Sequence, residues 1–243
     1  MLSALSMGKI PMIRELLNSF EHVPPDILKK KLKDILWEGT PDSKGLALTF
    51  DDGPDPEITP LVLDALDEAG ARGTFFMIGE QVKRHPVTAR MVVERGHLAG
   101  SHSMTHCTMF LMRRRDIERE IDDAQKAISD AVGMVPRWFR PPHGIFDFTS
   151  ADIIRQKGLL LVLWTVLSGD YSDDPPEKIF RTVDPFIRPG TIMVFHDTAR
   201  GGGLTLPGII HEIHLRAGSN GLRFIGVDDL SVSGHLDEID GDE

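Results

Sequence analysis

Six short apolar runs alternate with amphipathic stretches along this chain. Strands are predicted at Gly45–Phe50, Thr74–Ile78, His97–Ser101, Leu159–Thr165, Thr191–His196 and Leu222–Val227. Helical periodicity lies between them, in Pro60–Ala69, Val82–Arg95, Arg113–Val132, Glu177–Phe186 and Leu206–Arg216. Strands that alternate with helices in this way predict a parallel sheet in an α/β fold, because parallel neighbours need a crossover connection.

Composition narrows the class of protein further. The chain has 243 residues, 41% of them hydrophobic, which fits one domain with a substantial core. No run of about 18 apolar residues predicts a transmembrane helix. The net charge of −10 argues against nucleic acid as a partner. The single cysteine, Cys107, excludes a disulfide within the chain.

Two adjacent carboxylates, Asp51 and Asp52, follow the first predicted strand. Gly53 and Pro54 then turn the chain. Neighbouring residues on a strand point to opposite faces, so the two acids can share one aspect only where the strand has ended. One acid can then bind a metal while the other moves a proton. An ordinary turn is the alternative interpretation of two aspartates before a glycine.

Two histidines, His102 and His106, lie four residues apart after another apolar run. At this spacing both rings can face one cation. Imidazole suits Zn²⁺, Co²⁺ or Ni²⁺, and a catalytic zinc takes three protein ligands and keeps one position open. Two histidines and one carboxylate make such a set, although two surface histidines on a helix are the simpler interpretation. Both motifs follow predicted strands, where α/β folds build active sites.

Two later segments add further polar groups. Arg140 precedes two prolines, which fix the backbone and leave His143 and Gly144 as the nearby N–H donors, as an oxyanion hole requires. The run Ile192–His196 ends in a histidine, the side chain best suited to give a proton near neutral pH. Taken singly, Arg140 fits a surface ion pair and His196 a histidine at the edge of the core.

In this order the motifs resemble the polysaccharide deacetylases of carbohydrate esterase family 4, which act on chitin, chito-oligosaccharides, peptidoglycan and acetylxylan. The resemblance runs from about Gly45 to Phe224 and implies a distorted (β/α) barrel with about seven parallel strands. The matching segments are Thr49–Gly53, Gly73–Gly79, His102–His106, Arg140–Gly144, Trp164–Tyr171 and Val194–His196.

The resemblance also implies a role for each matching residue. Asp51 would be the general base and His196 the general acid, while Arg140 would hold Asp51 and be oriented by Asp170. The metal ligands would be Asp52, His102 and His106, binding a divalent ion, with Zn²⁺ favoured and Co²⁺ or Ni²⁺ as alternatives. The backbone N–H of His143 would help bind the oxyanion, and the substrate or oxyanion positions are Pro142, His143, Tyr171 and Val194. His143 and Tyr171 replace the aromatic ring and the tryptophan that the family often carries there.

The function implied is a metal-dependent hydrolase that removes N-acetyl groups from glycans containing N-acetylglucosamine, of the chito-oligosaccharide or peptidoglycan type. An N-acetylated glycan is then the expected partner. One alternative keeps the chemistry and changes the substrate to acetylxylan or a small cyclic amide. A second alternative is an inactive glycan-binding module. The sequence leaves the oligomeric state open.

The sequence divides into three predicted parts. We predict a helical extension at 1–40, a catalytic domain at 41–233 and a disordered acidic tail at 234–243. Apolar residues between Ile10 and Phe20 have helical spacing, but Arg14 and Glu15 interrupt the apolar core that a signal peptide needs, which predicts a cytoplasmic location. The stretch Pro25–Trp37 sets lysines against apolar residues. We favour a helix packed on the barrel over an amphipathic helix on a membrane surface.

Overall fold

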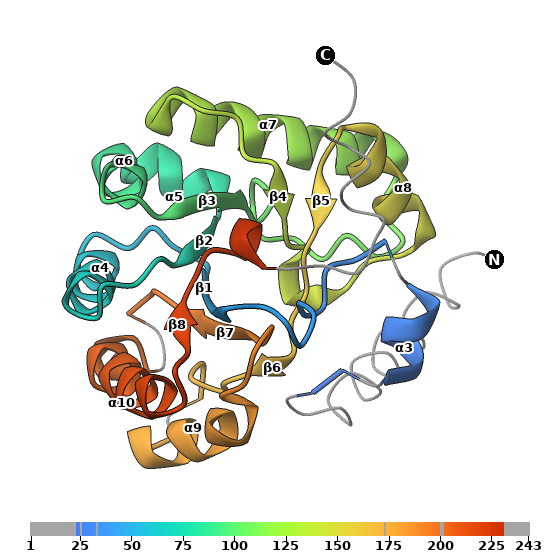
Figure 1. Ribbon diagram of the computed structural model, residues 1–243. Helices are drawn as coiled ribbons and strands as arrows, with labels where there is room; N and C mark the ends of the chain where they lie inside the picture. Colours follow the sequence, from blue (N-terminus) through green and yellow to red (C-terminus); the bar gives the residue numbers. More distant parts are fainter. Residues whose placement is uncertain (1–22, 25, 33, 173, 200–201, 231–243) are drawn as a thin grey trace.

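The computed structural model describes residues 23–24, 26–32, 34–172, 174–199 and 202–230 (Figure 1). The helical periodicity between Ile10 and Phe20 and the acidic tail at 234–243 therefore lie outside the described residues.

A parallel sheet forms the centre of the described chain. Its seven-strand path runs β5-β4-β3-β2-β1-β7-β6, and β8 pairs with the first half of β1. Every strand pair is parallel, and the path curls into a half-barrel, which confirms the predicted barrel of about seven strands. The strands are β1 Gly45–Asp51, β2 Thr74–Met77, β3 Leu98–Ser101, β4 Trp138–Phe139, β5 Leu160–Leu161, β6 Val166–Leu167, β7 Ile192–His196 and β8 Arg223–Phe224.

Helices pack side by side around the outside of the sheet. Neighbours contact one another in the order α9, α10, α4, α6, α7 and α8, while α5 packs on α6 and α7 (Figure 1). None of the described helices is long and apolar enough to cross a membrane. The helices are α3 Asp26–Lys31, α4 Ile58–Glu68, α5 Gly79–Arg84, α6 Pro86–Glu94, α7 Arg114–Val132, α8 Phe148–Gln156, α9 Pro176–Val183 and α10 Leu206–Ser219.

The alternation of side chains along β1 separates the core from the site. Leu46, Leu48 and Phe50 pack in the large apolar cluster that also contains residues of α4 and α10. The intervening Thr49 and Asp51 take the opposite face, where both contact the Arg140 side chain. One strand therefore anchors the helices with one face and presents polar groups inside the barrel with the other.

Two predicted elements differ in the structure, and two others were not expected. The helix expected at Val82–Arg95 is two helices that meet at His85 and Pro86, because proline has no N–H to continue the first and suits the first turn of the second. The strand expected at Leu159–Thr165 has only two residues in β5, and the chain re-enters the sheet as β6. The short strand β4 and the helix α8 were not predicted.

The helix expected at Pro25–Trp37 ends at Lys31, because the residues that follow pair with the barrel. The Leu36 N–H donates to the Leu161 carbonyl at 2.9 Å, and the Leu163 N–H donates to the Leu36 carbonyl at 2.8 Å. The Gly39 N–H reaches the Gly190 carbonyl, just before β7, at 2.7 Å. Ile35, Leu36 and Trp37 are buried in the barrel clusters. Residues 36–39 are thus hydrogen-bonded to the barrel, and the boundary at residue 40 stays a prediction.

His97, just before β3, is a buried titratable group far from the site's strand ends. Its Nδ1 accepts the Gly73 N–H at 3.1 Å, so Nε2 carries the proton, and within the described residues Nε2 makes no hydrogen bond. Burial lowers the pKa of His97 to about 4, helped by Arg95 and Arg72, while the charge of Asp67 acts in the opposite sense. The folded protein therefore keeps this imidazole neutral.

We expect His97 to destabilise the fold in acid. Between its ordinary pKa of 6.5 and about 4, the unfolded chain binds a proton that the folded chain does not, so the free energy of unfolding falls as the pH falls through this window. The slope from one proton is at most about 1.4 kcal/mol per pH unit. Urea unfolding at several pH values, with chelator present, should give a shallower pH dependence for His97→Asn than for the unchanged protein. Substitution of the exposed His211 by Asn is the control, and an unchanged slope in His97→Asn would contradict the assignment.

Candidate active site

The polar groups predicted from separate motifs meet at the carboxyl-terminal edge of the sheet. Asp51 is the last residue of β1 and His196 the last of β7, and the two are register partners. His102 and Arg140 directly follow β3 and β4, and Asp170 lies shortly after β6. Because parallel strands bring their carboxyl ends to one edge, residues up to 145 positions apart in the sequence form one site.

Asp52, His102 and His106 form a cluster with metal-ligand chemistry. The Asp52 Oδ1 atom lies 3.5 Å from His102 Nε2 and 3.1 Å from His106 Nε2. One ligand atom from each residue falls within 4.8 Å of the others. Asp52 has a φ of 73°, in the left-handed region that residues other than glycine adopt at a cost. The two adjacent aspartates have different closest partners, which are His106 for Asp52 and Arg140 for Asp51.

The donor set fits a divalent cation. The buried Asp52 Oδ1 has no hydrogen-bond partner among the described residues, so an acceptor atom is left for a cation. The His102 Nδ1–H donates to the Arg140 carbonyl at 2.7 Å, which leaves the Nε2 lone pair directed at the cluster. Burial lowers the pKa of His102 to about 4, against the charges of Asp51 and Asp52, so the ring is neutral near pH 7. Burial acts to raise the pKa of Asp52, but the close approach of His106 and the other nearby histidines lower it by more.

Asp51 pairs with a fully buried arginine, as the resemblance implied. The Arg140 guanidinium donates from one nitrogen to Asp51 Oδ1 at 2.7 Å and to Thr49 Oγ1 at 2.8 Å. Its other terminal nitrogen donates to the Leu163 carbonyl at 3.0 Å, and its carbon lies 4.1 Å from the Phe76 ring centre. Asp51 is itself only 4% exposed, and its partner keeps a negative charge stable in this buried position.

Asp170 orients His196, and the expectation that it orients Arg140 is wrong. Asp170 Oδ1 accepts from His196 Nδ1 at 2.8 Å and Oδ2 accepts from the His196 backbone N–H at 2.7 Å. Ser168 holds the same carboxylate through its hydroxyl at 2.8 Å. Burial acts to lower the pKa of His196, but the hydrogen bond and charge of Asp170, with Asp51 and Asp52, raise it to about 9. The ring is thus protonated near neutral pH, with Nε2 left to give a proton.

The predicted substrate positions surround these groups. His143 has a φ of 59° in a short 3₁₀ turn at Pro142–Gly144, and its ring centre lies 4.5 Å from that of His106. Gly144 has no room for a side chain, since a Cβ would lie 2.4 Å from the Trp164 ring. The half-exposed Tyr171 ring stands edge-on to His196 with centres 5.8 Å apart. Pro142 and Val194 are buried. The oxyanion role of the His143 N–H stays a prediction.

Three polar residues at the site were not predicted. Thr49 lies in the matching segment Thr49–Gly53 and Ser168 in Trp164–Tyr171. Their places in these motifs are the sequence signal that could have identified them. Asp197 is fully buried, accepts a hydrogen bond from Thr59 at 2.5 Å, and fills the space beside Gly53, where a Cβ would lie 2.3 Å from its Oδ2. Burial raises the pKa of Asp197 well above its usual range.

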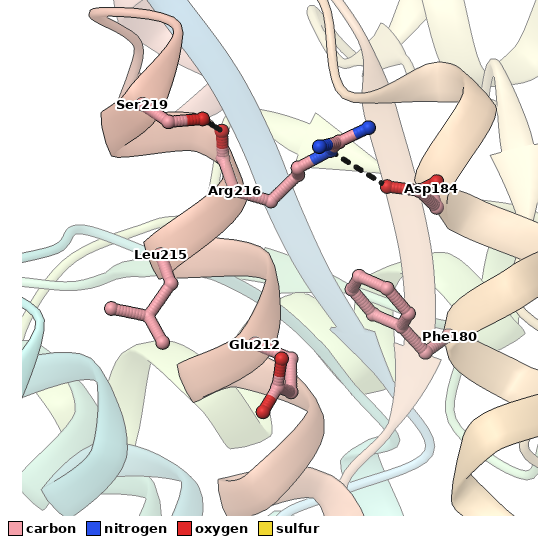
Figure 2. A pocket seen from close by; sticks show the side chains of 6 residues that line it. All are labelled: Phe180, Asp184, Glu212, Leu215, Arg216 and Ser219. Carbon is pink, nitrogen blue, oxygen red and sulfur yellow. Dashed lines mark hydrogen bonds and ion pairs between the residues drawn. The ribbon is translucent and has the colours of Figure 1, made fainter.

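A separate groove of about 530 Å³ lies between α9 and α10 (Figure 2). An ion pair between Arg216 and Asp184 crosses it at 3.2 Å. The groove contains none of the predicted site residues and is lined by Phe180, Asp184, Glu212, Leu215, Arg216 and Ser219.

Comparisons with known proteins agree with this geometry. A family model described as polysaccharide deacetylase matches residues 38–162. A peptidoglycan-N-acetylglucosamine deacetylase of Bacillus cereus is 32% identical over 209 residues, which cover 84% of this chain and 97% of the relative. A chitooligosaccharide deacetylase of Sinorhizobium fredii is 39% identical over 167 residues, covering 68% and 77% of the two chains.

The fold also matches solved structures. The crystal structure of the Bc1960 peptidoglycan N-acetylglucosamine deacetylase superposes with a TM-score of 0.78 at 24% identity, covering 82% of this chain and 94% of that one. Together with the sequence matches, this places the chain in the polysaccharide deacetylase family, carbohydrate esterase family 4.

Proposed function

We propose that this protein is a metal-dependent deacetylase that removes N-acetyl groups from glycans containing N-acetylglucosamine, of the peptidoglycan or chito-oligosaccharide type. The observation that carries the proposal is the meeting of three units at one sheet edge. These are the Asp52–His102–His106 cluster, the Asp51–Arg140 pair and the Asp170–His196 pair. The relatives named above carry the corresponding activities in their names.

Hydrolysis of an acetamide needs an activated water, stabilisation of the oxyanion and a proton for the leaving amine. Asp52, His102 and His106 would hold a divalent ion, Zn²⁺ by the preference of a mixed imidazole and carboxylate set. Such an ion lowers the pKa of a bound water to about 7 and polarises a carbonyl.

The chain's own residues supply the proton transfers. Asp51, kept anionic by Arg140, takes the proton of the attacking water. His196, protonated at Nε2 and held at Nδ1 by Asp170, gives a proton to the amine nitrogen. The backbone at His143, beside His106, would donate to the oxyanion.

The direct test is acetate release by the purified protein supplied with Zn²⁺, Co²⁺ or Ni²⁺. Chito-oligosaccharides, peptidoglycan fragments and acetylxylan form the substrate panel. We expect acetate and a free amine from the first two. Release from acetylxylan alone would replace the proposal with an esterase, and glycan binding without release from any substrate would indicate an inactive binding module.

The metal ligands are tested by substitution. His102→Ala and His106→Ala should each lose most of the bound metal, because each removes one of three ligand atoms, while circular dichroism stays that of a folded protein. Elemental analysis after dialysis measures the metal, and chelation should abolish activity of the unchanged protein. The exposed His211→Ala serves as the control, and full metal occupancy in both ligand variants would contradict the assignment.

The two aspartates should separate in their effects. Asp51→Asn is expected to lower kcat/KM by roughly 10²–10⁴ with its metal retained, because it removes the base but none of the three ligands. Asp52→Asn is expected to lose both activity and metal. Paired activity and metal measurements on each variant decide this, and exchanged behaviours would reverse the two roles.

The pH profile tests the pair Asp170–His196. The general acid His196 must be protonated, so activity is present below its pKa and is lost above it. Because this pKa is about 9, the loss is expected at alkaline pH. Asp170→Asn removes the charge that raises this pKa, so the alkaline limb of kcat/KM should move to lower pH. Ser168→Ala keeps that charge and should move the limb less. A limb at the same pH in Asp170→Asn would show that the titrating acid is another group.

A further inference from the structure

The two histidines of the metal cluster are oriented in different ways. The His102 ring is 3% exposed and fixed by its hydrogen bond to the Arg140 carbonyl. The His106 ring is 24% exposed, and its Nε2 lies 3.1 Å from Asp52 Oδ1, an atom of the same cluster. His106 has a φ of 59°, in the left-handed region that side chains other than glycine adopt at a cost. The position of this ligand therefore depends on how the backbone of its loop is held.

The backbone of this loop is held from within by Ser103, whose Oγ accepts the His106 N–H at 3.1 Å, and from outside by one side chain of another element. Glu120, in the middle of α7, is 8% exposed and directs its carboxylate at residues 104 and 105. Its Oε2 accepts the N–H of Met104 at 3.1 Å and that of Thr105 at 2.9 Å. Its Oε1 accepts the Thr105 hydroxyl at 3.0 Å. Hydrogen bonds to an ionised acceptor are stronger than neutral ones, and one residue thus supplies three of them to two consecutive loop residues.

The other contacts of the loop complement Glu120 and do not replace it. The carbonyls of Ser103 and Met104 accept the N–H groups of Gly79 and Glu80 at the start of α5, each at 2.9 Å. The Met104 side chain packs against Ala124 and Ala127 of α7. The Met104 and Thr105 N–H groups, which point the other way, are satisfied by Glu120. Without this carboxylate the turn that carries His106 would keep only the apolar contact of Met104 with α7 and would lose these hydrogen bonds to it.

We propose that Glu120 is a positioning residue of the metal site, which fixes His106 by binding the backbone of residues 104 and 105. The inference rests on the metal site of the proposed function and extends it to a residue that touches neither metal nor substrate. Partners of this kind, one step removed from the metal, typically change metal affinity by about 10–100-fold when they are substituted.

Three variants test whether Glu120 acts through the length of its side chain or through its negative charge. Glu120→Ala removes all three hydrogen bonds, and Glu120→Asp keeps the charge but is one methylene too short to reach both amides. Each should weaken Zn²⁺ binding by about 10–100-fold, measured by competition with a chromophoric chelator. Glu120→Gln should weaken it far less, because its carbonyl oxygen can accept both amide protons and its amide can donate to the Thr105 hydroxyl. Glu118→Ala, on the same helix but only partly buried and paired with Arg114, is the matched control and should bind Zn²⁺ like the unchanged protein.

The visible spectrum of the Co²⁺-loaded protein gives a readout that does not depend on activity. Glu120→Asp should alter it through the displaced His106, and Glu120→Gln should restore the original spectrum. If Glu120→Ala fails to fold, the Asp and Gln variants decide the question alone. Unchanged Zn²⁺ affinity and Co²⁺ spectrum in Glu120→Asp would overturn the inference and leave the proposed function standing. If the unchanged protein binds neither Zn²⁺ nor Co²⁺, the metal site itself is wrong and both proposals fall.

Discussion

The site depends on a single buried cation, the guanidinium of Arg140. Its side chain ties Asp51 and Thr49 of β1 to the carbonyl of Leu163, beyond β5, while its own backbone N–H donates to Ser101 of β3 and its carbonyl holds the His102 ring. A buried charge without its partner is strongly destabilising, so Asp51 and Arg140 hold each other in place. Arg140 therefore connects the predicted base Asp51, the predicted metal ligand His102 and polar groups at β1, at β3 and just beyond β5.

Much of the fold and most of the site could be predicted from the sequence. The six apolar runs all fall on strands, and three of them lead to Asp51, His102 and His196, so the rule that parallel strands end at one edge was enough to bring these residues together. The family resemblance supplied the pairing of Arg140 with Asp51. What failed were contacts that depend on side-chain direction, as with Asp170, whose partner is His196 and not Arg140.

Other features left no periodic signal to detect. The two-residue strand β4 is too short for alternation to be visible, and the helix expected at Pro25–Trp37 stops at Lys31 because Leu36 finds partners more than a hundred residues away. Glu120 lies in an amphipathic helix among other charged residues, and only the tertiary structure distinguishes it from its exposed neighbours. Tertiary contacts decided these positions, and local propensity did not.

The segment at residues 36–39 has a consequence for how this barrel behaves as a molecule. Its hydrogen bonds to Leu161, Leu163 and Gly190 satisfy backbone groups at and beyond the end of β5 and just before β7. A chain trimmed to begin at Gly45, the first strand, would present those groups and the apolar surface under Leu36 and Trp37 to solvent. Unpaired backbone beside apolar surface is a usual starting point for association between copies, so this short segment covers a surface that would otherwise favour association.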